Sequence, residues 1–411
     1  MSAQPPIPHG PAIYLAVVQF FFVSTWTVYV IFLPALLETA GIPKSYVIWV
    51  LMLDQAIFAI MDLALGRAAD RVGRTLGRIG PAILAVTAVS CIAFLLLPHA
   101  FRLPKDGPVS GATVAMVLVV IWVATSSALR APPWVLLSRY AATPAMPWLA
   151  ALNLTGLAIG GAIAPYLGVV LKGVDPALPF AVASIALIVT TAGLIRVERV
   201  LAARGDAADT PMAPRKAHAL DAPLALFFGA MAIAALGFQV HAFINAGPQY
   251  LRFAKPADLP WLIPVFWVGF NLAMFPGAGL AKRHGALPVI AVAAGAGCIG
   301  LLMAGLGTSL EWVIAGQLLA GGAWGAISMA SFSAVSRFGH TGHEGFMTGL
   351  LWSALSIATL LRMASVAAGL PGTAAGVIGW APTLLWAIAA VLVVLAWRRL
   401  PEAPPAAAGQ G

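Results

Sequence analysis

The sequence predicts an all-α integral membrane protein with twelve transmembrane helices, arranged as two six-helix pseudo-repeats. Of its 411 residues, 61% are hydrophobic and only 9% are charged, whereas a soluble protein carries about 25% charged residues. The mean hydropathy is +0.94. Apolar runs of the roughly 20 residues needed to span a bilayer recur twelve times along the chain. Such a chain folds against lipid and not around a single soluble core.

The bounds of the expected spans follow from where each apolar run begins and ends, with an uncertainty of several residues. The Pro132-Pro133 pair lies in the fourth span and is expected to kink or break its inner part, since proline removes a backbone donor. In chain order the spans are 12–34, 45–66, 79–97, 112–140, 146–171, 178–196, 222–246, 258–281, 286–306, 311–336, 345–369 and 375–398.

A single long polar stretch divides the spans into two sets of six. We therefore expect an N-terminal bundle over 12–198, a flexible linker over 199–221 and a C-terminal bundle over 222–398, with tails at 1–11 and 399–411. Short matches support an internal repeat: Lys282-Arg283-His284-Gly285 follows the eighth span as Asp70-Arg71-Val72-Gly73 follows the second. Two repeats in one orientation are known among secondary transporters.

The basic residues predict the orientation. The loops after even-numbered spans, together with the end of the chain, hold most of the 23 Lys and Arg residues. The positive-inside rule then makes the linker and both termini cytoplasmic, in a cell-membrane protein. The formal charge of +9 is thereby explained by membrane orientation, so nucleic acid is not an expected partner.

Several classes of protein are disfavoured by what the sequence contains. Cys91 and Cys298 each lie inside an apolar run, which indicates neither a disulfide framework nor a metal site. The phosphate-binding loop, zinc-protease and nucleophile-elbow patterns are absent from the sequence. We expect no enzyme, no catalytic residues, no cofactor and no bound metal.

The most specific motif is the basic turn between the second and third spans, over residues 66–78. Two glycines seven residues apart, Gly66 and Gly73, let the chain turn sharply where a side chain would clash. Asp70 is the one acid among several arginines and can satisfy free N–H groups at a helix start. The motif residues are Gly66, Asp70, Arg71, Gly73 and Arg74.

This turn resembles the signature loop of the major facilitator superfamily, Gly-x-Leu-Ala-Asp-Arg-x-Gly-Arg-Arg/Lys, with Ala68 where leucine is usual. The resemblance implies a transporter whose two halves rock about a central site. It also implies a gating role for the motif. We expect Asp70 to pair with Arg139 and to cap the start of the eleventh span near Gly345 when the protein is open outward.

Four charged residues fall within the expected spans, where charge is costly and usually functional: Asp54, Asp62, Arg130 and Arg362. For Asp62 we favour a structural pair with a cytoplasmic arginine. Arg130 either binds an anionic group or balances Asp62. For Asp54 we favour a functional role, and we expect it to pair with Arg362 across the two halves when the outer side is closed. In the competing arrangement, Asp54 and Arg362 each form bonds within their own half. Asp54 would then bond to a hydroxyl of the first span or to Arg130.

Polar and aromatic residues on the spans that line the cavity in the superfamily are candidates for the solute site. Each could instead form a local bond between helices. They are Gln19, Trp26, Ser126, Gln239, His241, Asn245, Gln317 and Trp324.

The sequence as a whole favours a secondary transporter that moves a small solute by alternating access and functions as a monomer in the lipid bilayer. Asp54 and His241 could titrate within the membrane, which would permit proton coupling. The alternative is a transporter-like membrane sensor or assembly factor that does not transport. The sequence does not identify the solute, the direction of movement or the coupling ion.

Overall fold

A computed structural model describes residues 9–76, 78–104, 110–140, 145–203, 221–339 and 342–400. The side chains of Arg74 and Arg139 and most of the expected linker lie outside the described residues. Within them the chain is helical, without strands. It has 12 helices or helix groups that are long and apolar enough to cross a membrane. The chain is therefore a multi-pass membrane protein.

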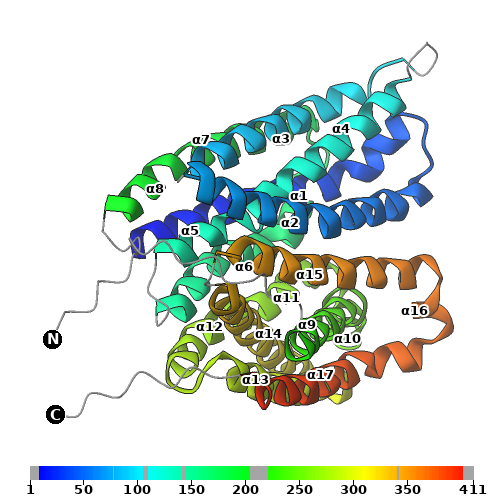
Figure 1. Cartoon of the computed structure of the whole chain (residues 1–411). Coiled ribbons are helices and arrows are strands. Elements are labelled where there is room, and N and C mark those ends of the chain that lie inside the picture. Colours follow the sequence, from blue (N-terminus) through cyan, green and yellow to red (C-terminus); the bar gives the residue numbers. More distant parts are fainter. Residues whose placement is uncertain are drawn as a thin grey trace.

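The first six spans form one group of helices, uppermost in Figure 1. The fourth span joins α4, the 3-10 turn η2 and α5, and the sixth joins α7 and α8. The elements are α1 (His9–Thr39), η1 (Lys44–Tyr46), α2 (Val47–Leu76), α3 (Gly80–Ala100), α4 (Gly111–Ser126), η2 (Ser127–Leu129), α5 (Pro132–Tyr140), α6 (Met146–Val170), α7 (Ala177–Ala192) and α8 (Leu194–Ala203).

The last six spans form the second group, lowermost in Figure 1. The seventh span contains a π-helical segment, η4, and the eighth begins with two short turns. The elements are α9 (Ala222–Val240), η4 (His241–Asn245), α10 (Ala246–Leu251), η5 (Pro256–Asp258), α11 (Leu259–Leu262), α12 (Pro264–His284), α13 (Ala286–Leu306), α14 (Leu310–Gly339), α15 (Glu344–Ala367), α16 (Leu370–Thr373) and α17 (Ala375–Trp397).

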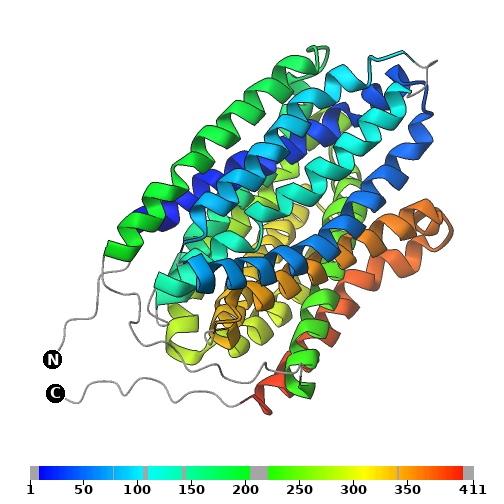
Figure 2. The ribbon, with the colours of Figure 1, turned by 45° about the horizontal axis from the view of Figure 1, so that its top comes forward.

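The two groups meet along two pairs of helices, α2 with α15 and α6 with α12. Figure 1 shows α2 and α15 running alongside each other at the boundary between the groups, and Figure 2 shows the same boundary from a second direction. The start of α1 and the end of α17 lie at one end of the bundle, which also holds the last turns of α2. We call this the Asp70 end.

The fourth span breaks where the prolines predicted it would. Pro133 has no N–H to donate to Leu129 in a continued α-helix. Instead Gln19 of α1 donates a 2.6 Å hydrogen bond from its side-chain amide to the Leu129 carbonyl. This bond satisfies a buried acceptor that the break would otherwise leave unpaired. It also fixes the position of Arg130, the residue that follows the 3-10 turn.

The sixth span is longer than the expected 178–196, because α8 remains helical to Ala203. The charged residues of this stretch suggested a linker, but they lie on an amphipathic helix with Leu194, Val197 and Leu201 buried. Glu198, also buried, accepts hydrogen bonds from the N–H groups of Ile79 (2.7 Å) and Gly80 (3.0 Å). It thereby caps the start of α3.

Candidate functional site

The signature motif joins the two halves at the Asp70 end. The Asp70 carboxylate accepts hydrogen bonds from the backbone N–H groups of Gly345 (2.7 Å) and Phe346 (2.8 Å), at the start of α15. His343, the N-cap residue of α15, provides no side-chain cap. A carboxylate from the other half therefore satisfies the free donors of this helix and complements its dipole. The expected cap is present; the side chain of Arg139, its expected partner, lies outside the described residues.

Backbone packing between α2 and α15 depends on glycine. A Cβ added to Gly66 would collide with the carbonyl of Gly345, and one added to Gly345 would collide with the carbonyl of Gly66. Small residues allow membrane helices to approach this closely. Of the other motif residues, Arg67 lies over the Phe346 ring at 4.5 Å and Arg71 is exposed. The motif thus combines a tight contact with a charged cap.

A buried ion pair continues this contact toward the middle of the bundle. Arg130 lies 3.3 Å from Asp62 of α2 and donates a 3.0 Å hydrogen bond to Ser356 of α15. Its guanidinium also lies over two rings, Phe58 of α2 at 4.4 Å and Trp352 of α15 at 4.6 Å. Arg130 therefore connects α2 to α15. Asp62 pairs with this arginine of the fourth span and not with a cytoplasmic arginine, the partner that was favoured from sequence.

One further hydrogen bond crosses between the same helices, from the Ser353 hydroxyl to the Ala59 carbonyl at 2.6 Å. We call the contacts of Gly66, Asp70, Arg130, Ser353 and Ser356 the polar seam. Apart from Arg130 of the fourth span, its members lie on α2 and α15, between the middle of these helices and the Asp70 end.

The second boundary, between α6 and α12, has a different chemistry. Trp148 contacts Phe275 with ring centroids 5.3 Å apart, and Tyr166 contacts Trp261 of α11 at 5.2 Å. Between them, Gly161 packs against the ring of Trp267. We call these contacts the aromatic seam. They extend along most of α6.

A cavity of about 150 Å³ lies between the halves, beside Arg130. Its walls come from both halves and include six aromatic residues. Three buried polar atoms of its lining residues, Nε of Arg130, Oε1 of Gln239 and Nε1 of Trp352, have no hydrogen-bond partner. The lining is Arg130, Leu154, Leu157, Ala235, Phe238, Gln239, Trp267, Phe270, Trp324, Ser328, Phe332, Trp352, Leu355 and Thr359.

Three of the residues singled out from the sequence line this cavity: Arg130, Gln239 and Trp324. Gln19 supports the helix break, and the Ser126 hydroxyl bonds the Val123 carbonyl within its own helix. Trp26 stacks on Trp122 inside the first half. None of these three lines the central cavity in this structure, because each is used in packing or in a local hydrogen bond, and their role in solute binding stays a prediction.

The remaining three candidates form polar contacts within the second half. His241 Nε2 lies 2.9 Å from Gln317 Oε1, and Gln317 donates to Gln249 at 3.1 Å. Asn245 donates to the Ile378 carbonyl at 3.0 Å and lines a separate cavity of about 460 Å³. His241 and Asn245 are the first and last residues of the π-helical segment. Their side-chain contacts therefore lie where the backbone hydrogen bonding departs from that of an α-helix. They too lie away from the central cavity.

Asp54 and Arg362 do not pair with each other in this structure. Asp54 accepts a 3.0 Å hydrogen bond from the Tyr29 hydroxyl of α1, and Arg362 lies over the Phe243 ring at 5.1 Å. Each therefore bonds within its own half. The register of α2 on α15 also places Arg362 about four residues, or roughly 6 Å, farther from the Asp70 end than Asp54. The two side chains thus differ in depth by about one helical turn, and their pairing in another conformation stays a prediction.

Sequence reasoning missed most of the cavity wall. Phe238, Trp267, Phe332 and Trp352 line it, but an aromatic residue in a wholly apolar helix carries no sign of the face it occupies. The available signal was their distribution: Trp267 and Trp352 lie on the eighth and eleventh spans, which also contribute along the boundary between halves in the superfamily.

Comparison with known proteins agrees with this architecture. The chain resembles the crystal structure of a bacterial homologue of the iron transporter ferroportin in an outward-facing state (TM-score 0.76, 14% identity, 95% of this chain and 100% of that one). It also resembles the human organic anion transporter MFSD10 (TM-score 0.67, 14%, 95% and 99%). The Escherichia coli fucose:proton symporter FucP is a third match (TM-score 0.63, 14%, 96% and 99%). No curated protein sequence matches the chain.

The described residues form twelve candidate membrane spans in two groups, with a cavity between the groups. Membrane transporters such as the neighbours above share this fold. The family model of the Major Facilitator Superfamily matches residues 15–363. The chain belongs to the Major Facilitator Superfamily, and family and fold together identify a transporter and not an enzyme.

Proposed function

We propose that this protein is a secondary active transporter that carries a small organic solute by alternating access. The observation that carries the proposal is the central cavity, whose walls come from both halves. Arg130 lines this cavity, pairs with Asp62 of its own half and donates across the polar seam to Ser356. A solute that contacts Arg130 would compete with the bonds that hold α2 to α15. Solute binding and movement of the halves would thereby be coupled through one side chain.

The chemistry of the cavity favours an organic solute with a flat or apolar body. Six of its fourteen lining residues are aromatic, and rings stack on flat groups. The unpartnered Nε of Arg130 offers a donor, and the Gln239 amide offers a further polar group. The described lining holds no carboxylate, thiol or imidazole, the side chains that transition metals prefer. We therefore favour an organic cargo over iron, the cargo named for the ferroportin-like neighbour.

The basic loops put the Asp70 end in the cytoplasm under the positive-inside rule. In that orientation the polar seam closes the cytoplasmic side, so the conformation described here would be the one that loads from outside. Asp62 is the carboxylate best placed for proton coupling. It is fully buried and contacts both Arg130 and Ser356. A proton on Asp62 would weaken its attraction to Arg130 and release the guanidinium toward the solute.

The first test is binding. Purified protein would be heated with a library of organic acids, amines, sugars and drug-like aromatics, because a ligand of the folded state raises the melting temperature. Trp324→Ala should abolish the shift given by a true cavity ligand. Trp380→Ala is the matched control, since Trp380 lines the separate cavity of the second half. If both variants keep the shift, the ligand does not use the central cavity.

The second test separates transport from sensing. The stabilising compound, in labelled form, would be measured in counterflow across proteoliposomes that contain the full-length protein. We expect uptake that Arg130→Gln reduces by more than about tenfold, because a buried charged contact is worth several kcal/mol. Binding without counterflow in the wild-type protein would instead favour a sensor that does not transport. Repeating the assay with and without a pH gradient tests whether transport is coupled to protons.

A further inference from the structure

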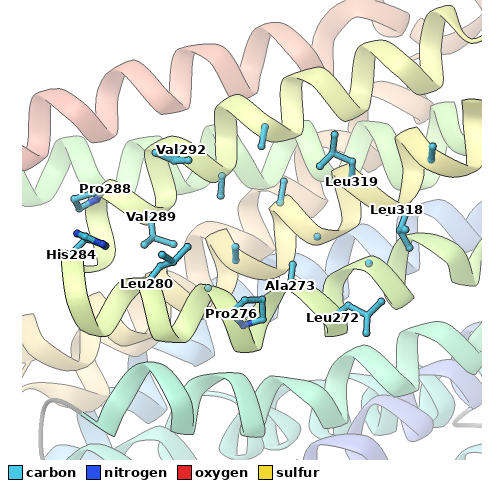
Figure 3. Close-up of a pocket in the computed structure, with 18 of the residues that line it drawn as sticks. Leu272, Ala273, Pro276, Leu280, His284, Pro288, Val289, Val292, Leu318 and Leu319 are labelled. Carbon is cyan, nitrogen blue, oxygen red and sulfur yellow. The ribbon is translucent and has the colours of Figure 1, made fainter.

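A third cavity, larger than the two already described, lies on the outside of the second half, between α12, α13 and α14. Its volume is about 950 Å³. Figure 3 shows it as an elongated groove, with His284 and Pro288 at one end and Leu272 and Leu318 at the other. Apart from His284 at that end, its walls are apolar, and small residues such as Gly269, Gly277 and Gly322 form its floor. The groove faces away from the central cavity described above.

The length of the groove matches one bilayer leaflet. It runs along α12 from Gly269 to His284, which is roughly 22 Å at 1.5 Å per residue. Half of a bilayer, headgroups included, is about 20–22 Å thick. The end marked by His284 lies at the Asp70 end of the bundle, where α12 finishes. The groove therefore extends from headgroup level to mid-membrane, as one phospholipid does.

The mouth of the groove is strongly basic. The last turn of α12 contains Lys282, Arg283 and His284, and Arg283 shares a face with Leu280 of the groove wall, three residues earlier. Trp397 also lines the groove, and the exposed Arg398 and Arg399 follow it directly. Among the described residues the ion pairs join other side chains, Lys44 with Glu38, Arg102 with Asp175 and Arg130 with Asp62. Within the described part of the chain, no ion pair joins the cations at the mouth to an acid.

We propose that this groove is a binding site for an anionic phospholipid. One acyl chain lies along α12 between α13 and α14, and the phosphate contacts Arg283 and Arg399 at the mouth. Membrane orientation and the α12 dipole explain why basic residues gather at this end, but they do not explain an apolar groove of leaflet length that opens between them. Basic pockets between helices are suited to anionic headgroups. This site is independent of the proposed solute and of transport.

Photo-crosslinking tests the site directly. The full-length protein would be placed in phosphatidylcholine nanodiscs with a trace of phosphatidylglycerol or phosphatidylcholine that carries a diazirine in its acyl chain. Labelled peptides would be identified by mass spectrometry. We expect phosphatidylglycerol to label α12, α13 and α14 at the groove about tenfold more than phosphatidylcholine, since each nearby cation strengthens anionic-lipid binding. Equal labelling by the two lipids would overturn the proposal.

Matched variants separate the contribution of the basic mouth to lipid labelling from that of the groove's shape. Arg283→Gln with Arg399→Gln should remove the preference for phosphatidylglycerol. The control, Arg196→Gln with Arg199→Gln, removes two exposed cations from α8 and should keep it. Ala296→Phe fills the groove and should reduce labelling, while Gly295→Phe, which points into open space, should not. A preference that survives the first double substitution, or crosslinks to a second copy of the protein at the groove, would overturn the proposal.

Discussion

The two seams between the halves use opposite chemistries. At the polar seam, Asp70 caps α15, Arg130 bridges Asp62 and Ser356, and Ser353 bonds the Ala59 carbonyl. At the aromatic seam, rings such as Trp148 and Phe275 or Tyr166 and Trp261 contact without such bonds between them. Directional bonds are made or broken as units, whereas ring contacts are weak individually and tolerate sliding. We infer that the polar seam is the gate and the aromatic seam the surface about which the halves rock.

Among substitutions at the two seams, removal of Arg130 should lower the stability of the protein most. Arg130→Leu leaves the fully buried Asp62 without its cation, and breaking a buried pair in this way costs about 3–5 kcal/mol. The double variant Asp62→Asn with Arg130→Leu should be more stable than the single variant, because no buried charge remains unpaired. Melting temperatures of the single and double variants measure this coupling. Additive losses would mean that the two side chains act independently.

Substitution of the seam glycines should have the next largest effect, and the loss of transport should differ between the two seams. Gly66→Leu places a side chain against the backbone of Gly345, whereas Gly161→Leu meets the movable ring of Trp267. Overpacking typically costs about 1–3 kcal/mol, and a side chain can yield where a backbone cannot. We therefore expect Gly66→Leu to reduce counterflow at least tenfold and Gly161→Leu to reduce it by no more than about threefold. Equal losses would contradict the division between gate and rocking surface.

The smallest expected effect comes from a single hydroxyl of the polar seam. Ser353→Ala removes the hydrogen bond to the Ala59 carbonyl, and such bonds between membrane helices average about 0.6 kcal/mol. The shift in the gate equilibrium should therefore be less than about threefold. Ser365→Ala is a suitable control, because its hydroxyl bonds the Arg362 carbonyl of its own helix. A larger effect in the control would show that Ser353 does not act through the seam.

The polar seam was also the more predictable of the two from sequence. Its motif has a specific residue pattern, and the free N–H groups at the start of α15 require an acceptor, so a cap by Asp70 could be expected. The Pro132-Pro133 break likewise follows from a missing donor. The aromatic seam and the cavity wall could not be predicted, because Trp267 or Phe332 in an apolar helix can face lipid, core or cavity equally well. Glu198 was missed because an acid beside the expected linker carries no sign that its carboxylate caps α3.

Asp70 and Glu198 offer the most direct test of the gate. Both carboxylates cap a helix start by accepting two backbone hydrogen bonds, but Asp70 reaches across the halves and Glu198 stays within one. Loss of such a cap costs about 0.5–2 kcal/mol. Asp70→Ala should therefore favour opening of the Asp70 end by up to about thirtyfold, whereas Glu198→Ala should lower stability and leave the gate equilibrium unchanged.

The decisive measurement is the distance between the halves at the Asp70 end, by pulsed electron spin resonance. Spin labels would be attached at Ala202→Cys of α8 and Lys282→Cys of α12, both exposed, after Cys91 and Cys298 are replaced by serine. We predict that Asp70→Ala adds a population with a longer distance and that Glu198→Ala keeps the distribution of the parent protein. An unchanged distribution in Asp70→Ala, or the same change in both variants, would contradict the assignment of the polar seam as the gate.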